Sequence, residues 1–198
     1  MKSALLLSGG MDSVALAYWM KPSLAITIDY GQVPAAGEVR ASKAVTEALG
    51  IPHKVLQVDC SPLGSGDLIG RAALPIAPMP EWWPFRNQLL LTLAAMSLAP
   101  EGVEQLWIGT VLSDGAHADG TPAFIEAMNH LLALQEGGMQ VAAPAIGLTS
   151  AELIQKSGIP RDLLAYSHSC HTDSFACGQC RGCGKHYETL EALGFEPY

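Results

Sequence analysis

The chain has 198 residues, of which 49% are hydrophobic and 15% charged; this is enough for one domain with a sizeable core and excludes a disordered chain. The formal net charge of -8 excludes a general electrostatic attraction to nucleic acid. The apolar runs are too short to cross a bilayer, and the apolar N-terminal stretch is too short for a signal peptide. We therefore expect a cytoplasmic protein without a nucleic-acid or membrane partner.

Short apolar runs alternate with segments of helical periodicity along the first two thirds of the chain. Strands are predicted at residues 3–7, 24–29, 54–58 and 105–109. Helices are predicted at residues 12–20, 34–49, 86–98 and 124–135. The first three strands and their intervening helices form a β-α-β-α-β series, which implies parallel pairing with right-handed crossovers. The sequence thus predicts an α/β fold with a parallel sheet and helices on both faces.

The remaining segments carry other signals. Residues 60–84 are rich in Gly and Pro without periodicity, which indicates a loop or lid. Thr149 and Glu152 form a capping box that starts a helix ending near Gly158, and a short helix is expected at 187–193. We treat residues 1–198 as a single domain, with a core at 1–160 and a metal-binding C-terminal segment at 161–198.

The segment Ser8-Gly9-Gly10-Met11-Asp12-Ser13 lies between a predicted strand and a predicted helix. Its glycines allow backbone N–H groups to converge on phosphate oxygens, and the helix N-terminus adds partial positive charge. Asp12 could cap the helix, hold a serine or help to bind Mg²⁺. A tight turn without a ligand is the alternative. The expected phosphate-binding residues are Leu7, Ser8, Gly9, Gly10, Met11, Asp12, Ser13 and Val14.

Four of the five cysteines crowd into one short segment with the spacing C-x6-C-x2-C-x2-C: Cys170, Cys177, Cys180 and Cys183. In a cytosolic chain such crowding indicates a metal site rather than disulfides. Four thiolates suit a closed, structural zinc site, an iron–sulfur cluster is the rival interpretation, and unpaired buried cysteines are the third.

The loop resembles that of the N-type ATP pyrophosphatases, and its combination with the cysteines resembles the 7-cyano-7-deazaguanine synthase family. Further stretches agree in order along nearly the whole chain: Asp29-Tyr30-Gly31-Gln32, Pro84-Phe85-Arg86-Asn87, Ile108-Gly109 with Asp114, Pro122-Ala123-Phe124, and Ser169-Cys170 before Cys177-Gly178-Gln179-Cys180.

This resemblance implies an ATP-dependent carbon–nitrogen ligase. The acid 7-carboxy-7-deazaguanine would be adenylated, converted by ammonia to an amide, and converted with a second ATP to the nitrile, releasing AMP and pyrophosphate. The implied cofactors are ATP, Mg²⁺ and Zn²⁺, and the implied catalytic residues are Asp12 and Arg86. Arg86 could instead be a structural partner of a carboxylate. Asp114, His117 and Asp119 follow a strand end, where ligands bind in open sheets, and a solvated loop is the alternative for them.

Several positions depart from the family pattern. Val33-Pro34 stand where the family has Arg-His, and Ser150 stands where it has Lys. Because such positions tend to contact substrate, a paralogue that passes the acid to another amine, such as one on a protein, stays an alternative. A tRNA thiolating enzyme and a relative that binds nucleotide without turnover are the others. A homodimer is one expectation for assembly.

Overall fold

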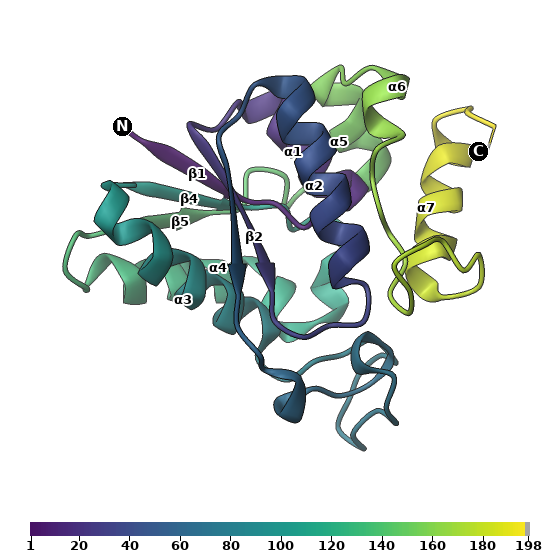
Figure 1. The fold of residues 1–198 in the computed structure, drawn as a ribbon, viewed down its shortest axis with the longest axis horizontal. Helices are drawn as coiled ribbons and strands as arrows, with labels where there is room; N and C mark the ends of the chain where they lie inside the picture. Colours follow the sequence, from purple (N-terminus) through teal and green to yellow (C-terminus); the bar gives the residue numbers. More distant parts are fainter. Residues whose placement is uncertain (197–198) are drawn as a thin grey trace.

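A computed structural model describes residues 1–196 and contains one five-stranded parallel sheet (Figure 1). Its strands are β1 (Ser3–Leu6), β2 (Leu24–Asp29), β3 (His53–Gln57), β4 (Gln105–Ile108) and β5 (Gln140–Ala142). The strand order is β3-β2-β1-β4-β5, so β1 lies at the centre, with Leu5 opposite Ala25 on one side and Trp107 on the other. The predicted parallel sheet is confirmed. Strand β5 was not predicted, since three residues give too short a pattern.

Helices cover both faces of the sheet, as predicted (Figure 1). They are α1 (Met11–Met20), α2 (Ala35–Leu49), α3 (Arg86–Leu98), α4 (Pro122–Ala133), α5 (Ser150–Ser157), α6 (Arg161–Leu164) and α7 (Arg181–Ala192). The capping box of Thr149 and Glu152 and the left-handed Gly158 at the end of α5 are confirmed. Helix α6 was not predicted, and α7 starts well before the predicted position at 187. Its start was missed because a cysteine, Cys180, occupies the N-cap.

Side chains of the central strand alternate between two cores. Ala4 and Leu6 pack on the side of α3 and α4, whereas Leu5 and Leu7 pack on the side of α1 and α5. Because both faces of β1 are buried, its sequence is a continuous apolar run rather than an alternating one. This arrangement fixes the carboxyl ends of β1 and β4, where the loops that carry the candidate site begin.

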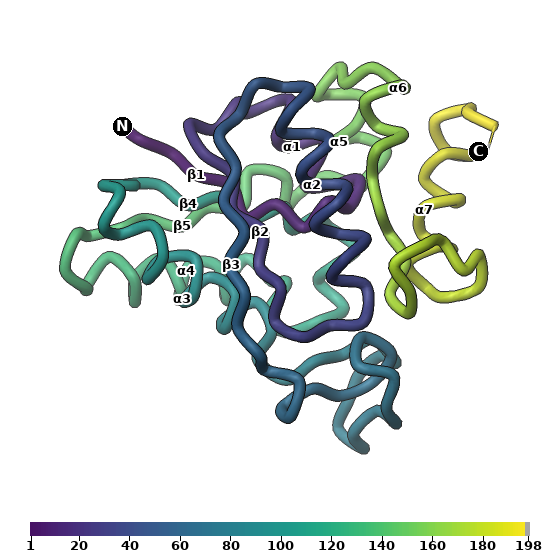
Figure 2. Tube along the Cα trace, in the orientation of Figure 1, coloured from purple at the N-terminus to yellow at the C-terminus, as the bar shows by residue number. Residues whose placement is uncertain are grey.

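The segment 60–84 is irregular, as predicted, apart from two short 3-10 turns, η1 (Ser61–Leu63) and η2 (Asp67–Ile69). The tube in Figure 2 shows it extending from the end of β3 beneath the sheet before the chain enters α3. Trp83 is only 2% exposed and meets Tyr30 edge to face with ring centroids 4.9 Å apart. A buried aromatic pair therefore holds the end of this loop against the carboxyl end of β2.

The segment before α7 crosses the glycine-rich loop at residues 8–13, named the phosphate loop after its expected ligand, and the start of α2. The His168 N–H donates to the Gly9 carbonyl at 2.8 Å, and the Arg40 guanidinium donates to the Ser174 carbonyl.

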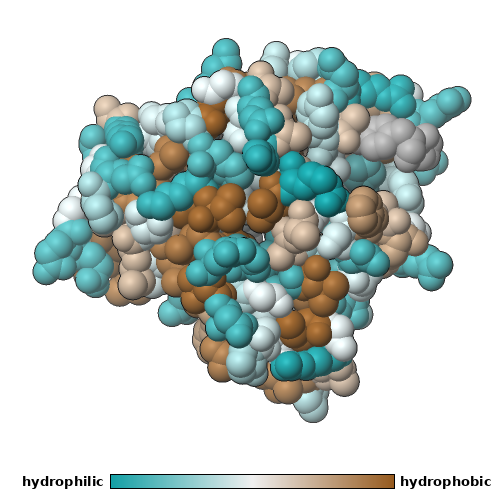
Figure 3. All heavy atoms as spheres, in the orientation of Figure 1, coloured by the Kyte–Doolittle hydropathy of each residue, from teal (hydrophilic) through white to brown (hydrophobic). Residues whose placement is uncertain are grey.

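Polar and apolar residues are interspersed over the face drawn in Figure 3, with an apolar group near its centre. Within residues 1–196, no helix is both long and apolar enough to span a bilayer.

Candidate active site

The phosphate loop connects β1 to α1 through a turn that only glycine fits. Gly9 has φ +81°, and a Cβ there would lie 2.8 Å from the Glu38 carbonyl oxygen. Gly10 occupies the N-cap of α1 without a side-chain cap. The Ser8 and Ser13 hydroxyls lie 3.2 Å apart, and Ser13 donates to the Gly10 carbonyl at 2.9 Å. The turn therefore places two hydroxyls beside the N-terminus of α1, an environment that favours an anion.

A cavity of about 700 Å³ opens over this loop at the carboxyl ends of the strands. Of the predicted phosphate-binding and catalytic residues and the three residues predicted after β4, those that line it are Leu7, Ser8, Gly10, Met11, Asp12, Ser13, Arg86, Asp114, His117 and Asp119. Two of the predicted phosphate-binding residues do not line it. Gly9 faces α2, and Val14 is fully buried in the core, because it points from α1 toward the sheet.

Asp12 forms an ion pair rather than a helix cap or a bond to a serine. Its Oδ2 lies 2.9 Å from Nζ of Lys185, which also lies 3.3 Å from Oδ1 of Asp114. Asp114 is held in turn, since its Oδ2 accepts the Val111 N–H at 3.0 Å. Burial alone would lower the pKa of Lys185, but Asp12 and Asp114 raise it, so the ammonium stays charged. Three elements thus meet at one cation: α1, the turn after β4, and α7.

Arg86 begins α3 and lines the same cavity. Burial would lower its pKa, but the Tyr30 hydroxyl and the carboxyls of Asp119, Glu38 and Asp114 raise it. Asp119 also accepts a hydrogen bond at 3.0 Å from the backbone N–H of Asn87, the residue that follows Arg86. Arg86 therefore has acidic partners, which agrees with a structural role. It also lines the cavity, which agrees with a catalytic role.

Glu38, on α2, also lines the cavity and was not predicted from the sequence. Its carboxylate accepts the Gln32 side-chain amide at 2.7 Å. Burial raises the pKa of Glu38 to about 7, against the opposing effects of Gln32 and Arg86. A carboxyl that titrates near neutral pH inside a cavity suits proton exchange with a ligand.

The loop at 60–84 is tied to α7 through Glu81, which is 5% exposed. Its Oε1 lies 3.4 Å from Nη1 of Arg181 and 3.6 Å from Nε2 of His117. Burial would raise the pKa of Glu81, but the contact with His117, a hydrogen bond that the carboxylate accepts from its own backbone N–H, and the charge of Arg181 lower it to about 2. These contacts form a charged cluster along one side of the cavity.

The four cysteines come together as the sequence predicts, with all four sulfur atoms within 4.8 Å of one another. The Sγ–Sγ distances are 3.9 Å for Cys177 with Cys183 and 3.8 Å for Cys180 with Cys170. A Zn–S distance of about 2.3 Å in a tetrahedron requires sulfurs about 3.8 Å apart. The donor set therefore fits one tetrahedral ion.

Backbone amides support the thiolates. The N–H groups of Gln179 and Cys180 donate to Cys177 Sγ at 3.4 and 3.3 Å, and that of His171 donates to Cys180 Sγ at 3.3 Å. A hydrogen bond from the Thr172 hydroxyl, followed by these amides, lowers the pKa of Cys177 to about 6. Such bonds stabilise the charged form that a metal requires. His168 and His171, which flank Cys170 in the sequence, are not members of this group.

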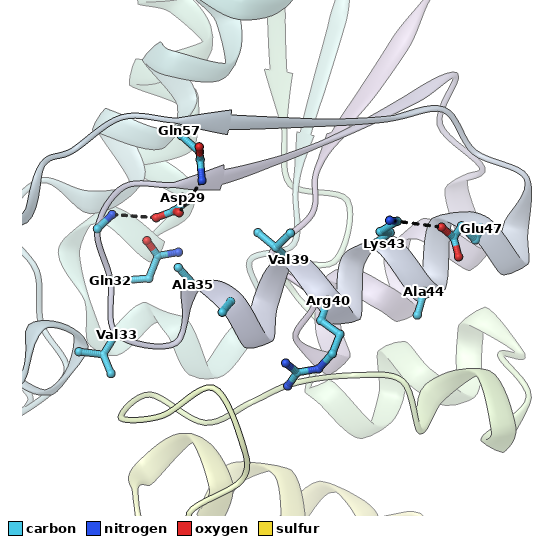
Figure 4. A pocket seen from close by; sticks show the side chains of 12 residues that line it. Asp29, Gln32, Val33, Ala35, Val39, Arg40, Lys43, Ala44, Glu47 and Gln57 are labelled. Atoms are coloured by element: carbon cyan, nitrogen blue, oxygen red, sulfur yellow. Dashed lines mark hydrogen bonds and ion pairs between the residues drawn. The ribbon is translucent and has the colours of Figure 1, made fainter.

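A second hollow, of about 810 Å³, lies along α2 beside the edge of the sheet (Figure 4). Arg40, Lys43 and Glu47 of α2 line it with Asp29 and Gln57 of the neighbouring strands. It is larger than the cavity over the phosphate loop, but no residue of that loop lines it. Its charged side chains are largely paired with one another or with the nearby backbone, so we assign the chemistry to the smaller cavity.

Fold and site together define a class: an α/β protein with a parallel sheet, a glycine-rich anion loop after the central strand, and a four-thiolate cluster beside that loop. Solved structures include one of this fold, the U34-tRNA thiolase NcsA from Methanococcus maripaludis with its [4Fe-4S] cluster. It aligns with a TM-score of 0.56 and 16% identity over 97% of this chain and 65% of the thiolase chain. At that identity the likeness shows the fold alone.

Residues 2–194 match the family described as "Queuosine biosynthesis protein QueC", and the chain belongs to this family. It is 33% identical to the 7-cyano-7-deazaguanine synthase of Desulforudis audaxviator, over 92% of this chain and 93% of the relative. It is 29% identical to the 7-cyano-7-deazaguanine synthase of Methanocaldococcus jannaschii, over 99% and 97%. The family resemblance expected from the motifs is confirmed.

The charged residues of the cavity that sequence reasoning missed include Lys185, Glu38 and Glu81. Each is a single charged residue without a local motif. Lys185 and Asp12 are 173 positions apart, and no pattern within either segment indicates that they meet. The one available signal is position, because Lys185 follows the last metal-ligand candidate by two residues.

Proposed function

We propose that this protein adenylates 7-carboxy-7-deazaguanine with ATP and converts it through the amide to the nitrile 7-cyano-7-deazaguanine. In the first step a carboxylate oxygen bonds to the α-phosphorus, and pyrophosphate leaves with the electron pair of the broken P–O bond. Ammonia then bonds to the acyl carbon, AMP leaves, and one proton passes to solvent. The amide oxygen next bonds to the α-phosphorus of a second ATP, a second pyrophosphate leaves, and loss of AMP with two protons leaves the nitrile.

The observation that carries this proposal is the meeting of an anion loop, paired carboxylates and Arg86 in one cavity. The loop amides and the hydroxyls of Ser8 and Ser13 are suited to phosphate oxygens. Asp12 and Asp114 offer oxygen ligands that suit Mg²⁺, which when bound would offset phosphate charge. Arg86 is suited to orient the carboxylate of the acid, because a guanidinium binds carboxylates in a fixed geometry. Family membership and the identity to synthases support the same chemistry.

The four cysteines hold zinc in this proposal, in a structural role. Four protein ligands leave no open position for chemistry. The sulfur spacing of 3.8 and 3.9 Å supports a single ion over an iron–sulfur cluster, whose thiolates surround a larger core of irons and sulfides. We accordingly propose a core at 1–160 and a zinc-binding segment at 161–198, of which the last two residues lie outside the described part.

The test is mass spectrometry of products after incubation with ATP, Mg²⁺, ammonium and 7-carboxy-7-deazaguanine. We expect the amide and the nitrile, with AMP and pyrophosphate. Asp12→Ala should abolish AMP formation, whereas Asp162→Ala, which removes an exposed carboxylate elsewhere, should not. Acid-dependent AMP release without amide or nitrile would favour transfer to another amine. No acid-dependent AMP release by the wild type would refute the proposal.

A further inference from the structure

Lys185 has an unusual position for a residue of the cysteine-bearing segment. It lies on α7, two residues after Cys183, yet its Nζ reaches the phosphate loop at Asp12 Oδ2, 2.9 Å away. The same Nζ lies 3.3 Å from Asp114 Oδ1, in the turn after β4. All three side chains line the cavity, and 38% of the lysine side chain remains exposed. A partly exposed cation is therefore available at the loop itself.

The other basic side chains that line the cavity within the described chain are placed elsewhere. Arg181 is paired with Glu81, and Arg86 lies among Tyr30 and the carboxyls near it. Among the lysines and arginines of the described chain that line the cavity, Lys185 is thus the one that contacts the phosphate loop. A chain of net charge -8 needs local positive charge to bind a polyphosphate, and Lys185 supplies it where phosphate would enter.

The carboxylates around Lys185 can accept a different cation. Asp12 Oδ1 is buried and has no hydrogen-bond partner among the described residues, although Oδ2 is paired with the lysine. Buried polar atoms are normally satisfied, so an orphan oxygen here indicates that a ligand completes the site. Two carboxylates that converge on one Nζ also present the oxygen donors that Mg²⁺ prefers.

We propose that Lys185 is a phosphate-binding residue of the adenylation site. This rests on the proposed function and adds a role for the C-terminal helix. Asp12 and Asp114 would hold the Mg²⁺ that accompanies ATP, and the ammonium of Lys185 would then bind the phosphate oxygens. There it offsets the charge that grows on pyrophosphate as the P–O bond breaks.

The cysteine cluster explains how Lys185 reaches this position. Cys180 caps the start of α7 through its Sγ, which accepts the Cys183 N–H at 3.4 Å. The same sulfur accepts the His171 N–H, from the segment that crosses the phosphate loop. The helix is therefore held at the end nearest the loop, and Lys185 projects from its first turns. The cysteine-bearing segment would thus position a substrate-binding side chain as well as stabilise the fold.

The test compares Lys185→Met with Lys185→Arg and Lys43→Met. Methionine keeps an unbranched stem and removes the charge, and arginine keeps the charge. Lys43 is a control because it is exposed and lies on α2 in a weak pair with Glu47, 4.0 Å away. Calorimetry with Mg²⁺-ATP and with Mg²⁺-pyrophosphate gives the dissociation constants without the acid substrate, and circular dichroism gives the melting temperature.

Lys185→Met should raise both dissociation constants about tenfold or more, on the scale of one charge-assisted hydrogen bond. Lys185→Arg should stay within a few-fold of the wild type, and Lys43→Met should match it. Unchanged or tighter binding by Lys185→Met overturns the proposal. Equal loss by the Met and Arg variants, with equally lowered melting temperatures, also overturns it, because the lysine would then be a structural tie. A wild type that binds Mg²⁺-ATP but does not use the deazaguanine acid refutes the proposed function and leaves this test intact.

Discussion

Replacing Glu38 by glutamine should change how stability depends on pH. Glu38 lines the cavity, and burial raises its pKa from 4.5 to about 7. Between those values the unfolded chain releases this proton while the folded chain keeps it. The carboxyl's stabilising contribution is therefore complete below about pH 4.5 and is lost as the pH rises through 7. Glutamine accepts the same hydrogen bond from Gln32 but has no proton to lose.

The size of the effect follows from the pKa difference. One pKa unit corresponds to about 1.4 kcal/mol, so the rise from 4.5 to about 7 corresponds to about 3 kcal/mol. Other titrating groups are common to the two proteins and cancel in the comparison. Relative to the wild type, Glu38→Gln should therefore gain about 3 kcal/mol in unfolding free energy between pH 4.5 and pH 8.

Urea unfolding at pH 4.5, 6, 7 and 8 measures this difference, provided that the m-values agree. Glu47→Gln is the matched control, because Glu47 is on the same helix with 68% of its side chain exposed. The control should run parallel to the wild type. Parallel curves for Glu38→Gln would show that Glu38 keeps an ordinary pKa. A Glu38→Gln variant that loses stability relative to the wild type as the pH rises from 4.5 to 8 would show that Arg86 stabilises the ionised Glu38 and that its pKa is not raised.

Other predictions concern the metal cluster and one strained residue. The purified protein should be colourless and contain about one zinc per chain by elemental analysis, as four thiolates form a closed tetrahedral site; iron with sulfide, or no metal, would contradict this. Cys180→Ala should lose zinc and lower the melting temperature, with AMP release falling as a consequence, because the segment has little hydrophobic content to offset its ordering. Unchanged zinc and melting with no AMP release would make Cys180 catalytic. Phe85→Gly should raise the unfolding free energy by about 1 kcal/mol in urea, since Phe85 has φ +54° and is 74% exposed; a loss of stability would show that its ring contributes more than the strain costs.

Local patterns in the sequence were enough to predict much of the fold. The apolar run of β1, the glycines after it and the periodicity of α1 to α3 each lie within a few residues, and each specifies its own element. The cysteine spacing likewise predicted the four-thiolate group, because ligands within 14 residues can converge with little help from the rest of the chain. The helix start at Cys180 was missed because the usual N-cap residues are Ser, Thr, Asp and Asn.

Tertiary structure decided which charges meet in the cavity. The parallel order β3-β2-β1-β4-β5 brings the ends of β1 and β4 together, so Asp12 and Asp114 come within reach of one lysine. Burial, which no local pattern records, raises the pKa of Glu38 to about 7. The sequence determined the glycine-rich loop and the four-cysteine group, because their geometry is local. The partners of Asp12, Arg86 and Glu38 come from distant elements, so only the packing of those elements could assign them.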